Sequence, residues 1–249
     1  MSERVVHLAE LEPGIVRITL EDRTHKNAFS DRLLNGIVEA FAEVAANPSW
    51  NAVILTGYDT YFCTGGTQDM LLKLSKGEGR FTDFPIYNLP LTCEIPVIAA
   101  MQGHAVGGGL ALGLFADFVV LSRESVYTAN FMKYGFTPGF GSTLVMREKL
   151  GLPLAQALLM TAANYRGDEL ARHGIAFPVL PRAEVAAHAL DIARQLADKP
   201  RHSLVTLKAH LNAPLRAMLP EVTAREVEMH ERTFPHPEVQ QRIRALFGS

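Results

Sequence analysis

Residues 96–122 read PVIAAMQGHAVGGGLALGLFADFVVLS, and this stretch decides the fold. Its first part, Val97 to Met101, is apolar, short and continuous, which predicts a buried β-strand and not an amphipathic helix. Three consecutive glycines, 107–109, follow, and a helical run of small and apolar residues comes next. A second apolar run, 118–121, predicts another buried strand, so the stretch is interpreted as strand, glycine turn, helix and strand.

The glycine triplet is also a candidate binding site. Glycine has no Cβ, so a ligand can approach the backbone at Gly107, Gly108 and Gly109. The first amides of a helix have no partner within the helix and lie at the positive end of its dipole, where an oxyanion is favoured. A turn chosen only for tight helix packing is the alternative, and this stretch alone does not decide between the two.

The chain before this stretch predicts layers of strands and helices. Val16, Ile18 and Leu20 alternate with polar residues, as in a half-buried strand, and 52–57 reads as a fully buried strand. Between them, Ser30 is placed to cap a helix that carries an apolar stripe. The members of this stripe are Leu33, Leu34, Ile37, Val38, Phe41 and Val44. This order of elements predicts an α/β layered domain.

A second glycine site lies in the sequence YFCTGGTQD, residues 61–69, where another strand gives way to a helical run. The two sites follow successive strands, so the fold can bring them to one crevice at the strand ends. A single amide binds a carbonyl oxygen weakly, whereas two convergent amides form an oxyanion hole. The pair of sites therefore favours catalysis over simple packing.

The rest of the chain divides into a core and a helical end. Residues 73–87 are polar and punctuated by glycine, which predicts a mobile flap or a solvated loop, and 168–181 predicts a turn and a short strand. From residue 187 the composition is helical, with helices expected at 187–196, 203–211, 220–234 and 237–247. We therefore predict an α/β core over 1–199 and a C-terminal helical region over 200–249.

Composition narrows the class of protein. Of the 249 residues, 48% are hydrophobic and 20% are charged, as in an ordinary globular protein. A formal net charge of −2 gives no broad attraction for nucleic acid or an anionic membrane, so neither partner is expected. Cys63 and Cys93 lack metal-ligand spacing and form no disulfide framework, which favours a reducing compartment and no metal. With no signal-type or membrane-spanning apolar run, a cytoplasmic protein is predicted.

Four motifs in order carry a family resemblance. They are RTHKNAF at 23–29, FCTGG at 62–66, QGHAVGGG at 102–109 and FTPGFGST at 136–143. With these motifs the chain resembles the crotonase (enoyl-CoA hydratase/isomerase) superfamily over essentially its whole length. The resemblance implies an α/β spiral of ββα units, a C-terminal helical trimerisation region in a homotrimer or hexamer, and an acyl thioester substrate. It places the two oxyanion amides at Thr64 and Gly108.

The chain departs from the hydratases of this superfamily at two positions. Hydratases carry one glutamate two residues after the glycine triplet and another seven residues before the Pro-Gly turn, whereas this sequence has Ala111 and Phe131 there. Adding water to an enoyl thioester needs a general acid–base group beside each reacting centre. Three alternatives stay open: a hydratase with carboxylates from other positions, an enoyl isomerase with the same oxyanion hole, and a non-catalytic homologue.

An enolate also forms when a suitably conjugated acyl thioester loses CO2, which needs no strong base because the departing CO2 leaves its electrons behind. The reaction needs a dry site, a cation or donor for the carboxylate, and an acid that reprotonates carbon. Lys76 and Arg80 in the flap are candidates for holding the carboxylate. His230 is the candidate acid, because it interrupts a largely apolar stripe of the helix expected at 220–234; a structural core histidine is the alternative.

A closer resemblance is to the decarboxylase branch found in polyketide β-branching cassettes. It rests on segments such as GGTQ, CEIPVIAAMQGH and SRESVYTANFMKYGFTPG. It implies that 3-methylglutaconyl carried on an acyl carrier protein, or on coenzyme A, loses CO2 to give 3-methylcrotonyl, with no cofactor beyond the phosphopantetheine arm. The branch uses a histidine that matches His230 and a flap lysine, whose place Arg80 is expected to take; Lys76 is the other candidate.

Five further residues are candidates for substrate binding. Arg23 and Lys26 either touch the phosphopantetheine arm or are simply solvated, and the sequence does not decide between these two roles. Tyr87, Phe131 and Tyr134 are expected to line the acyl pocket, with ordinary aromatic packing as the alternative for the two tyrosines.

Overall fold

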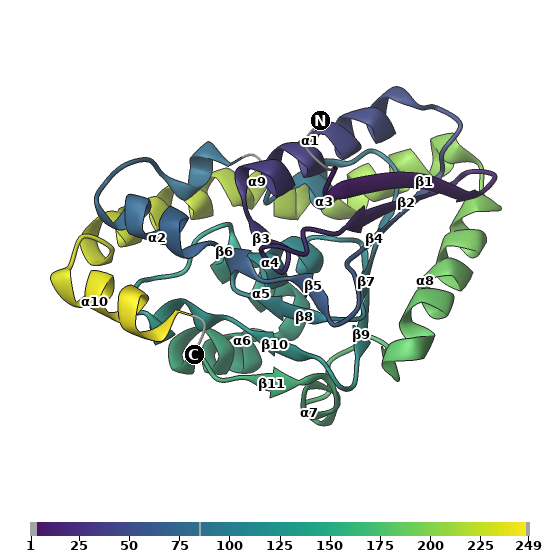
Figure 1. Ribbon diagram of the computed structural model, residues 1–249. Helices are drawn as coiled ribbons and strands as arrows, with labels where there is room; N and C mark the ends of the chain where they lie inside the picture. The colour runs from purple at the N-terminus through teal and green to yellow at the C-terminus, as the bar shows by residue number, and fades with distance from the viewer. Residues whose placement is uncertain (1–3, 85, 248–249) are drawn as a thin grey trace.

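The computed structural model describes residues 4–84 and 86–247 and has a large sheet at one side of a layered α/β core (Figure 1). This sheet has six strands in the order β1-β2-β4-β7-β9-β12. Within it, β1 and β2 pair antiparallel and the other neighbours pair in parallel, as continuous apolar runs predict. Its strands are β1 (Val6–Glu12), β2 (Ile15–Leu20), β4 (Ala52–Thr56), β7 (Val97–Met101), β9 (Phe118–Ser122) and β12 (Val179–Leu180).

A second, smaller sheet lies inside the molecule and makes the repeat of the fold visible. It has four strands, in the order β11 (Tyr165–Arg166), β10 (Val126–Thr128), β8 (His104–Val106) and β5 (Tyr61–Cys63), and a separate pair joins β3 (Ala28–Phe29) to β6 (Gly65–Gly66). Successive units send one strand to the large sheet and the next to the small sheet before a helix follows: β4, β5 and α2, then β7, β8 and α4. This arrangement confirms the predicted α/β spiral of ββα units.

The first two helices, α1 and α2, begin at side-chain caps, and the cap of α1 is the predicted one. The Ser30 side chain accepts a hydrogen bond from the Leu33 amide at 3.2 Å and starts α1, whose buried residues belong to the predicted stripe or adjoin it. Thr67 caps α2 in the same way through the Met70 amide. The helices are α1 (Asp31–Ala46), α2 (Gln68–Ser75), α3 (Leu89–Thr92), α4 (Gly108–Leu114), α5 (Ser142–Leu150), α6 (Leu152–Thr161), α7 (Gly167–Arg172), α8 (Arg182–Ala197), α9 (Arg201–Thr233) and α10 (Pro237–Leu246), with short 3-10 turns at Phe81–Asp83 and Asn130–Lys133.

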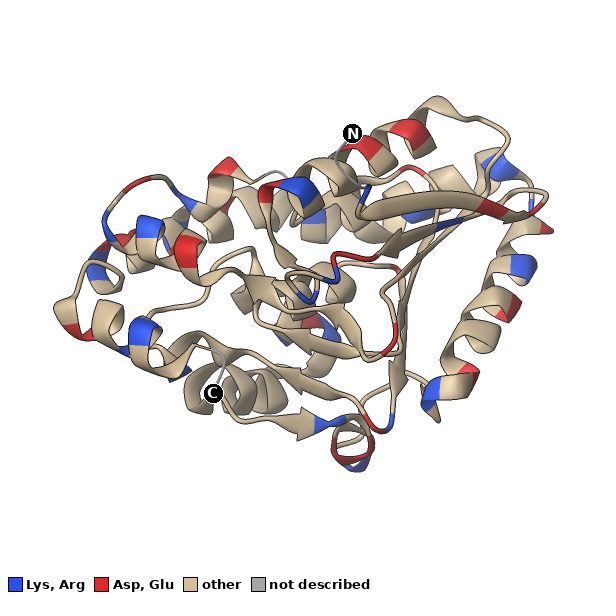
Figure 2. Ribbon diagram, in the orientation of Figure 1, with Lys and Arg blue, Asp and Glu red and all other residues tan. Residues whose placement is uncertain are grey.

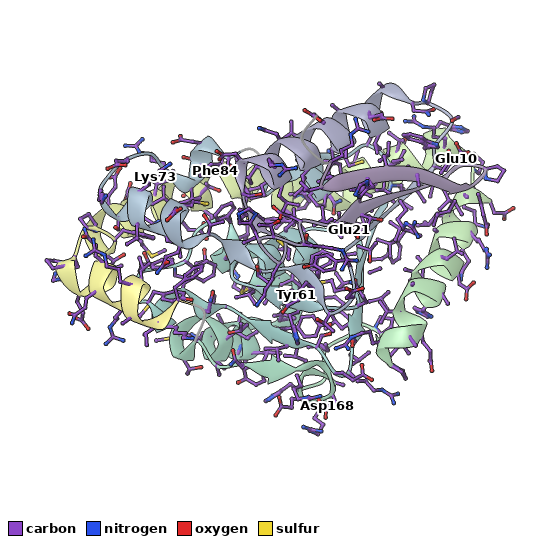
Figure 3. All side chains as sticks on the ribbon, in the orientation of Figure 1. Glu10, Glu21, Tyr61, Lys73, Phe84 and Asp168 are labelled. Carbon is purple, nitrogen blue, oxygen red and sulfur yellow. The ribbon has the colours of Figure 1, made fainter. Side chains whose placement is uncertain are left out.

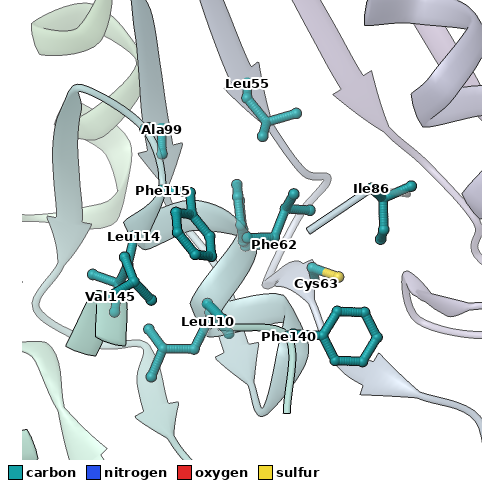
Figure 4. Packing of buried hydrophobic residues seen from close by; sticks show 14 of the residues in the cluster. Leu55, Phe62, Cys63, Ile86, Ala99, Leu110, Leu114, Phe115, Phe140 and Val145 are labelled. Carbon is teal, nitrogen blue, oxygen red and sulfur yellow. The ribbon is translucent and has the colours of Figure 1, made fainter. Parts of the chain in front are cut away.

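Helix α4 is the centre of the core. All seven of its residues are buried, and the aromatic and aliphatic side chains of neighbouring elements surround it (Figure 4). A Cβ on Gly109 would lie 2.2 Å from the carbonyl oxygen of Cys63, and one on Gly113 would lie 2.6 Å from Sδ of Met101. Tight packing therefore explains Gly109 and Gly113, so part of the glycine run follows the packing interpretation.

Helix α8 covers the outer face of the large sheet, as Figure 1 shows at the right of the molecule. Its buried Val185, Ala189 and Ala193 pack against Ile54 and other apolar residues of the sheet. Small side chains at this spacing let the helix lie close to the sheet. The main core is separate from this one and joins the inner face of the sheet to the cavity-lining residues Phe131 and Phe140.

The C-terminal region differs from its prediction in one respect. The sequence predicts two helices, 203–211 and 220–234, and this is wrong, because α9 is one continuous helix of 33 residues that contains Pro214 and Pro220. A proline removes a backbone donor and usually ends or kinks a helix. Contacts with the core hold this one together: the Lys208 side chain, 3% exposed, pairs with Asp117 at 2.7 Å and donates to two backbone carbonyls. Residues 168–172, predicted as a turn, are likewise helical and belong to α7.

Charged side chains of both signs alternate along the outer helices α1, α2 and α8, and no face of one sign stands out in Figure 2. Among residues 4–84 and 86–247, no helix is both long and apolar enough to cross a membrane. The same residues contain no group of three or more His, Cys, Asp or Glu side chains arranged to hold a metal ion. Both cysteines are free thiols.

Candidate active site

A cavity of about 560 Å³ opens between the two glycine sites and α9. The backbones of Gly66, Gly107 and Gly108 form one part of its wall, and Tyr61 of β5, labelled at the centre of Figure 3, lies on its rim. Aromatic side chains supply most of the rest. No Asp or Glu among the described residues lines the cavity, and its titratable groups include His230 and Lys26.

The second glycine site meets the cavity as predicted. Gly107 has a positive φ of 54° and ends β8 by donating its amide to Thr128 at 2.8 Å, so the next amide begins α4. Gly108 lines the cavity, and a Cβ there would lie 2.8 Å from Cε2 of Phe29 and 3.5 Å from Cδ2 of Phe140. Only glycine fits at this position without displacing those rings, which leaves the first amide of the helix open to a ligand.

At the first glycine site the expected donor is already engaged. The Thr64 amide donates to the Asn27 carbonyl at 3.1 Å, so the predicted role of this amide in the oxyanion hole is contradicted by the structure. The physical reason is the preceding loop, where Lys26 and Asn27 have φ values of 53° and 54° and turn their carbonyls toward Thr64. Gly66, two residues further on, lines the same cavity.

His230 stands in an aromatic enclosure formed by three elements. Its ring centroid lies 4.9 Å from that of Phe81, 5.8 Å from Phe136 and 4.8 Å from Phe234. Its Nε2 is buried and has no hydrogen-bond partner among the described residues. Burial lowers the pKa of His230 to about 4, although a hydrogen bond with the backbone of Thr137 favours the protonated ring. The ring is therefore neutral at pH 7 before a ligand binds.

The two flap cations lie outside this cavity. Lys76 is the residue after α2 and is exposed, and it lines neither of the two cavities near His230. Arg80 is 63% exposed and pairs with Glu231 at 2.8 Å. It lines a second cavity of about 380 Å³, which shares the side chains of Phe81 and His230 with the first. His230 thus belongs to the wall between the cavity with the glycine amides and the chamber with Arg80.

The predicted substrate contacts fall into two groups. Lys26, Phe131 and Tyr134 line the cavity, and burial raises the pKa of the Tyr134 phenol. Arg23 instead pairs with carboxylates at the surface and stacks over the ring of Tyr58 at 4.6 Å, so it lies outside.

Tyr87 also lies outside the cavity lining and packs behind it. Its ring centroid is 6.1 Å from that of Phe140, and its hydroxyl is hydrogen-bonded to Thr223. The aromatic-packing alternative therefore describes the position of Tyr87, which supports Phe140 from the side away from the substrate space.

Sequence reasoning missed several cavity residues. His25 lines the cavity with its Nδ1 at 2.9 Å from the buried Asp22 carboxylate, and only the folded loop reveals this pair. His104 accepts a hydrogen bond from the Val126 amide at 2.9 Å and also lines the cavity. Phe140 was visible only as part of the FTPGFGST motif.

The surroundings of Cys63 do not favour a reactive thiol. It is fully buried next to the first glycine site, and desolvation raises the pKa of its thiol to about 12. A thiol in this environment is not a nucleophile.

Comparisons with known proteins show what the whole chain is similar to. A sequence profile of the family described as enoyl-CoA hydratase/isomerase matches residues 10–247. Bacillaene synthase decarboxylase PksI of Bacillus subtilis (strain 168) is 57% identical over 249 residues, all of both chains. A solved structure from a dehydratase/decarboxylase enzyme couple involved in polyketide β-branching has a TM-score of 0.98 and 57% identity, over 98% of this chain and 100% of that one.

The ECH2 decarboxylase domain of CurF from Lyngbya majuscula has a TM-score of 0.93 and 48% identity, over 97% of this chain and 99% of that one. These matches confirm the resemblance to the decarboxylase branch as well as to the superfamily. Similarity of this extent covers the fold, the glycine sites and the C-terminal helices together. The chain belongs to the enoyl-CoA hydratase/isomerase family.

Proposed function

We propose that this protein decarboxylates a 3-methylglutaconyl thioester, carried on an acyl carrier protein, to the 3-methylcrotonyl thioester. One observation carries the proposal: the backbones of Gly66 and Gly108 and the ring of His230 line the cavity, but no Asp or Glu among the described residues does. Hydration needs positioned acid–base groups, which carboxylates usually supply in this setting, whereas loss of CO2 does not. The similarity to two decarboxylases supports the same choice.

In the proposed reaction, the thioester oxygen accepts hydrogen bonds from the amides of Gly108 and Gly66. Gly66 takes the place predicted for Thr64, whose amide is occupied. The bond between the carboxylate carbon and the γ carbon breaks, and its electron pair passes through the conjugated system to the thioester oxygen. CO2 leaves as a neutral molecule, and the amides stabilise the dienolate that remains.

Arg80 is the proposed partner of the distal carboxylate, in preference to Lys76. Arg80 lines the chamber on the other side of His230, whereas Lys76 lines neither cavity. To reach the substrate, Arg80 must exchange Glu231 for the substrate carboxylate, and an exposed ion pair of this kind costs little to break. A guanidinium binds a carboxylate with two hydrogen bonds but stays protonated, so another group must deliver the proton.

His230 is the proposed proton donor, provided that its ring is first protonated. The neutral ring has its Nδ1 engaged at Thr137, so Nε2 has no proton to give in the free protein. A carboxylate that enters beside the ring raises its pKa, because the opposite charge favours imidazolium. Binding of the substrate carboxylate therefore favours the protonated form of His230. After CO2 leaves, Nε2 transfers this proton to the γ carbon.

The surrounding aromatic wall keeps the carboxylate away from water. Three buried rings line the cavity, each at most 6% exposed: Phe81, Phe131 and Phe140. A carboxylate loses its hydration when it enters such a site. When CO2 leaves, the negative charge moves to the thioester oxygen, where the oxyanion hole stabilises it.

The carrier and the assembly are part of the proposal. Lys26 at the cavity rim is placed to meet the phosphopantetheine arm, whether carried by a protein or by coenzyme A. Exposed Leu207, Leu211 and Met218 along α9 support a subunit interface in a homotrimer or a hexamer, which light scattering of the purified protein tests. A cytoplasmic location and the division at residue 199 remain predictions.

The deciding experiment is the intact mass of 3-methylglutaconyl-loaded carrier protein after incubation with the enzyme. Loss of CO2 supports the proposal. Unchanged mass with a shifted double bond, read by NMR of the released acyl group, would mean an isomerase, and addition of water would mean a hydratase. No change with a competent substrate would leave a non-catalytic homologue.

A further inference from the structure

A buried carboxylate lies beneath the cavity and has no part in the proposed chemistry. Glu226 is on α9, one helical turn before His230, and is 1% exposed. Among the described residues, no Lys, Arg or His side chain forms an ion pair with Glu226. A carboxylate in this position is costly unless several donors satisfy it, so its partners indicate what it does.

The described residues that donate hydrogen bonds to Glu226 all belong to one turn of the core. Oε2 accepts from the Gly141 amide at 2.7 Å, and Oε1 accepts from the Thr143 amide at 2.9 Å and the Thr143 hydroxyl at 2.6 Å. These are the first donors of α5, a helix of nine residues whose own cap residue, Gly141, has no side chain. Glu226 therefore caps α5 from a helix more than 80 residues away in the chain.

The capped turn carries a wall of the cavity. Phe140, immediately before Gly141, has a φ of 62°, a left-handed conformation that is strained for a non-glycine residue. Its ring lies 5.4 Å from Phe29 and 5.6 Å from Phe81. Phe29 is the ring that a side chain on Gly108 would strike, Phe140 would lie in ordinary contact with that side chain, and Phe81 packs on His230.

From this geometry we propose that Glu226 is a positioning residue: it holds the strained Phe140 turn so that the acyl wall, the Gly108 amide and His230 keep their mutual spacing. The carboxylate and His230 share one helix, so the clamp ties the proton donor of α9 to the oxyanion side of the core. The role rests on the proposed decarboxylation. The titratable group that faces Glu226 from another element is Tyr87, through Thr223, and it bears no charge that would pair with the carboxylate.

The test compares Glu226→Gln with the parent enzyme on the loaded carrier. Glutamine retains the shape but has one acceptor oxygen, and its amide group meets a backbone donor. We expect kcat to fall about tenfold with KM changed less than about twofold, because the substrate still docks but is misaligned. Thr143→Val removes one donor and is the milder variant if Glu226→Gln folds poorly; a loss of about threefold in kcat is expected.

A double-mutant cycle separates positioning from general stability. In a Phe140→Leu background, Glu226→Gln should lower kcat further by less than about twofold, because the ring that Glu226 holds in place is absent. Asp117→Asn, which loosens the buried contact with Lys208 away from the cavity, is the control: it should lower Tm and leave kcat unchanged. A Glu226→Gln enzyme with lower Tm and parental kcat, or equal kcat losses in both backgrounds, would overturn the proposal.

A readout without turnover distinguishes this proposal from the proposed function. The chain has 13 phenylalanines, so fluorophenylalanine labelling gives a ¹⁹F spectrum in which Phe140→Leu identifies the Phe140 signal. Glu226→Gln should shift or broaden that signal, and Asp117→Asn should not. An unmoved Phe140 signal refutes the clamp even if the enzyme decarboxylates, whereas an inactive parent with a shifted signal refutes the function alone.

Discussion

The proposed substrate space has two ends, the cavity with the glycine amides and the neighbouring chamber with Arg80, and they are built in different ways. At the glycine end, Gly108 presents its backbone amide, and the ring of Phe29 leaves no room for a side chain on this residue. At the flap end, Arg80 and Glu231 form an ion pair in which both side chains are more than half exposed. Backbone groups held by packing are preorganised, whereas an exposed ion pair can change partner at low cost. The first end is suited to charge that develops on the thioester, and the second to a carboxylate that enters with the substrate and is lost as CO2.

The largest effect should come from filling the glycine end. Gly108→Ala places a methyl group 2.8 Å from Phe29 Cε2, and Phe29 is itself packed on Phe140, so the helix start must shift. We expect kcat/KM for loaded carrier protein to fall about a thousandfold, the size of a lost oxyanion donor.

The matched control for that change is Gly77→Ala in the flap, where nothing lies within 4 Å of the new Cβ, although φ is 76°. It should cost about 1 kcal/mol of unfolding free energy and change turnover less than about threefold. Comparable activity losses in both variants would break the contrast between the two ends.

The next effect concerns stability and pH. His230 has a pKa of about 4 in the folded protein and an ordinary value of 6.5, so the unfolded chain binds more protons between these pH values. The stabilisation is fully present above pH 6.5 and is lost as the pH falls toward 4, by about 3 kcal/mol. Denaturant unfolding of the parent and of His230→Gln over this pH range measures the difference. Parallel stability curves would show that burial does not depress the pKa.

Replacing the same histidine should also slow the chemistry. His230→Gln removes the group that gains and delivers the proton, while the glycine amides remain. We expect kcat to fall about a hundredfold with little change in KM. The intact-mass assay measures this rate, and Tyr58→Phe, at a residue that does not line the cavity, is the control. Unchanged turnover in His230→Gln would remove the role of this residue.

The smallest effect should come from the flap end. Glu231→Gln releases Arg80 from its 2.8 Å ion pair, so the guanidinium is free to bind the substrate carboxylate. KM for the carboxylated thioester should fall about threefold, and the affinity for the decarboxylated product should not change. Arg80→Ala, measured beside it, should raise KM. If Glu231→Gln instead weakens substrate binding, Glu231 supports the site and does not compete for Arg80.

Most of the fold was predictable because it rests on local pattern. The continuous apolar run of β7 and the cap at Ser30 appear in the structure at the expected residues. The continuity of α9 through Pro214 and Pro220 could not be predicted, because the helix is anchored by contacts with the core such as that of the buried Lys208 with Asp117. Long-range anchors of this kind leave no periodic signal in a sequence.

By itself, the sequence determined that glycines meet a helix start at two successive units and that Ala111 and Phe131 replace the carboxylates of a hydratase. Such features depend on residue type and local spacing. The tertiary structure alone decided which amides stay open, because the Thr64 donor is used by Asn27, a residue 37 positions earlier in the chain. It also decided that His230 is neutral and that Arg80 lies behind it, since burial and ion pairing arise only when distant segments meet.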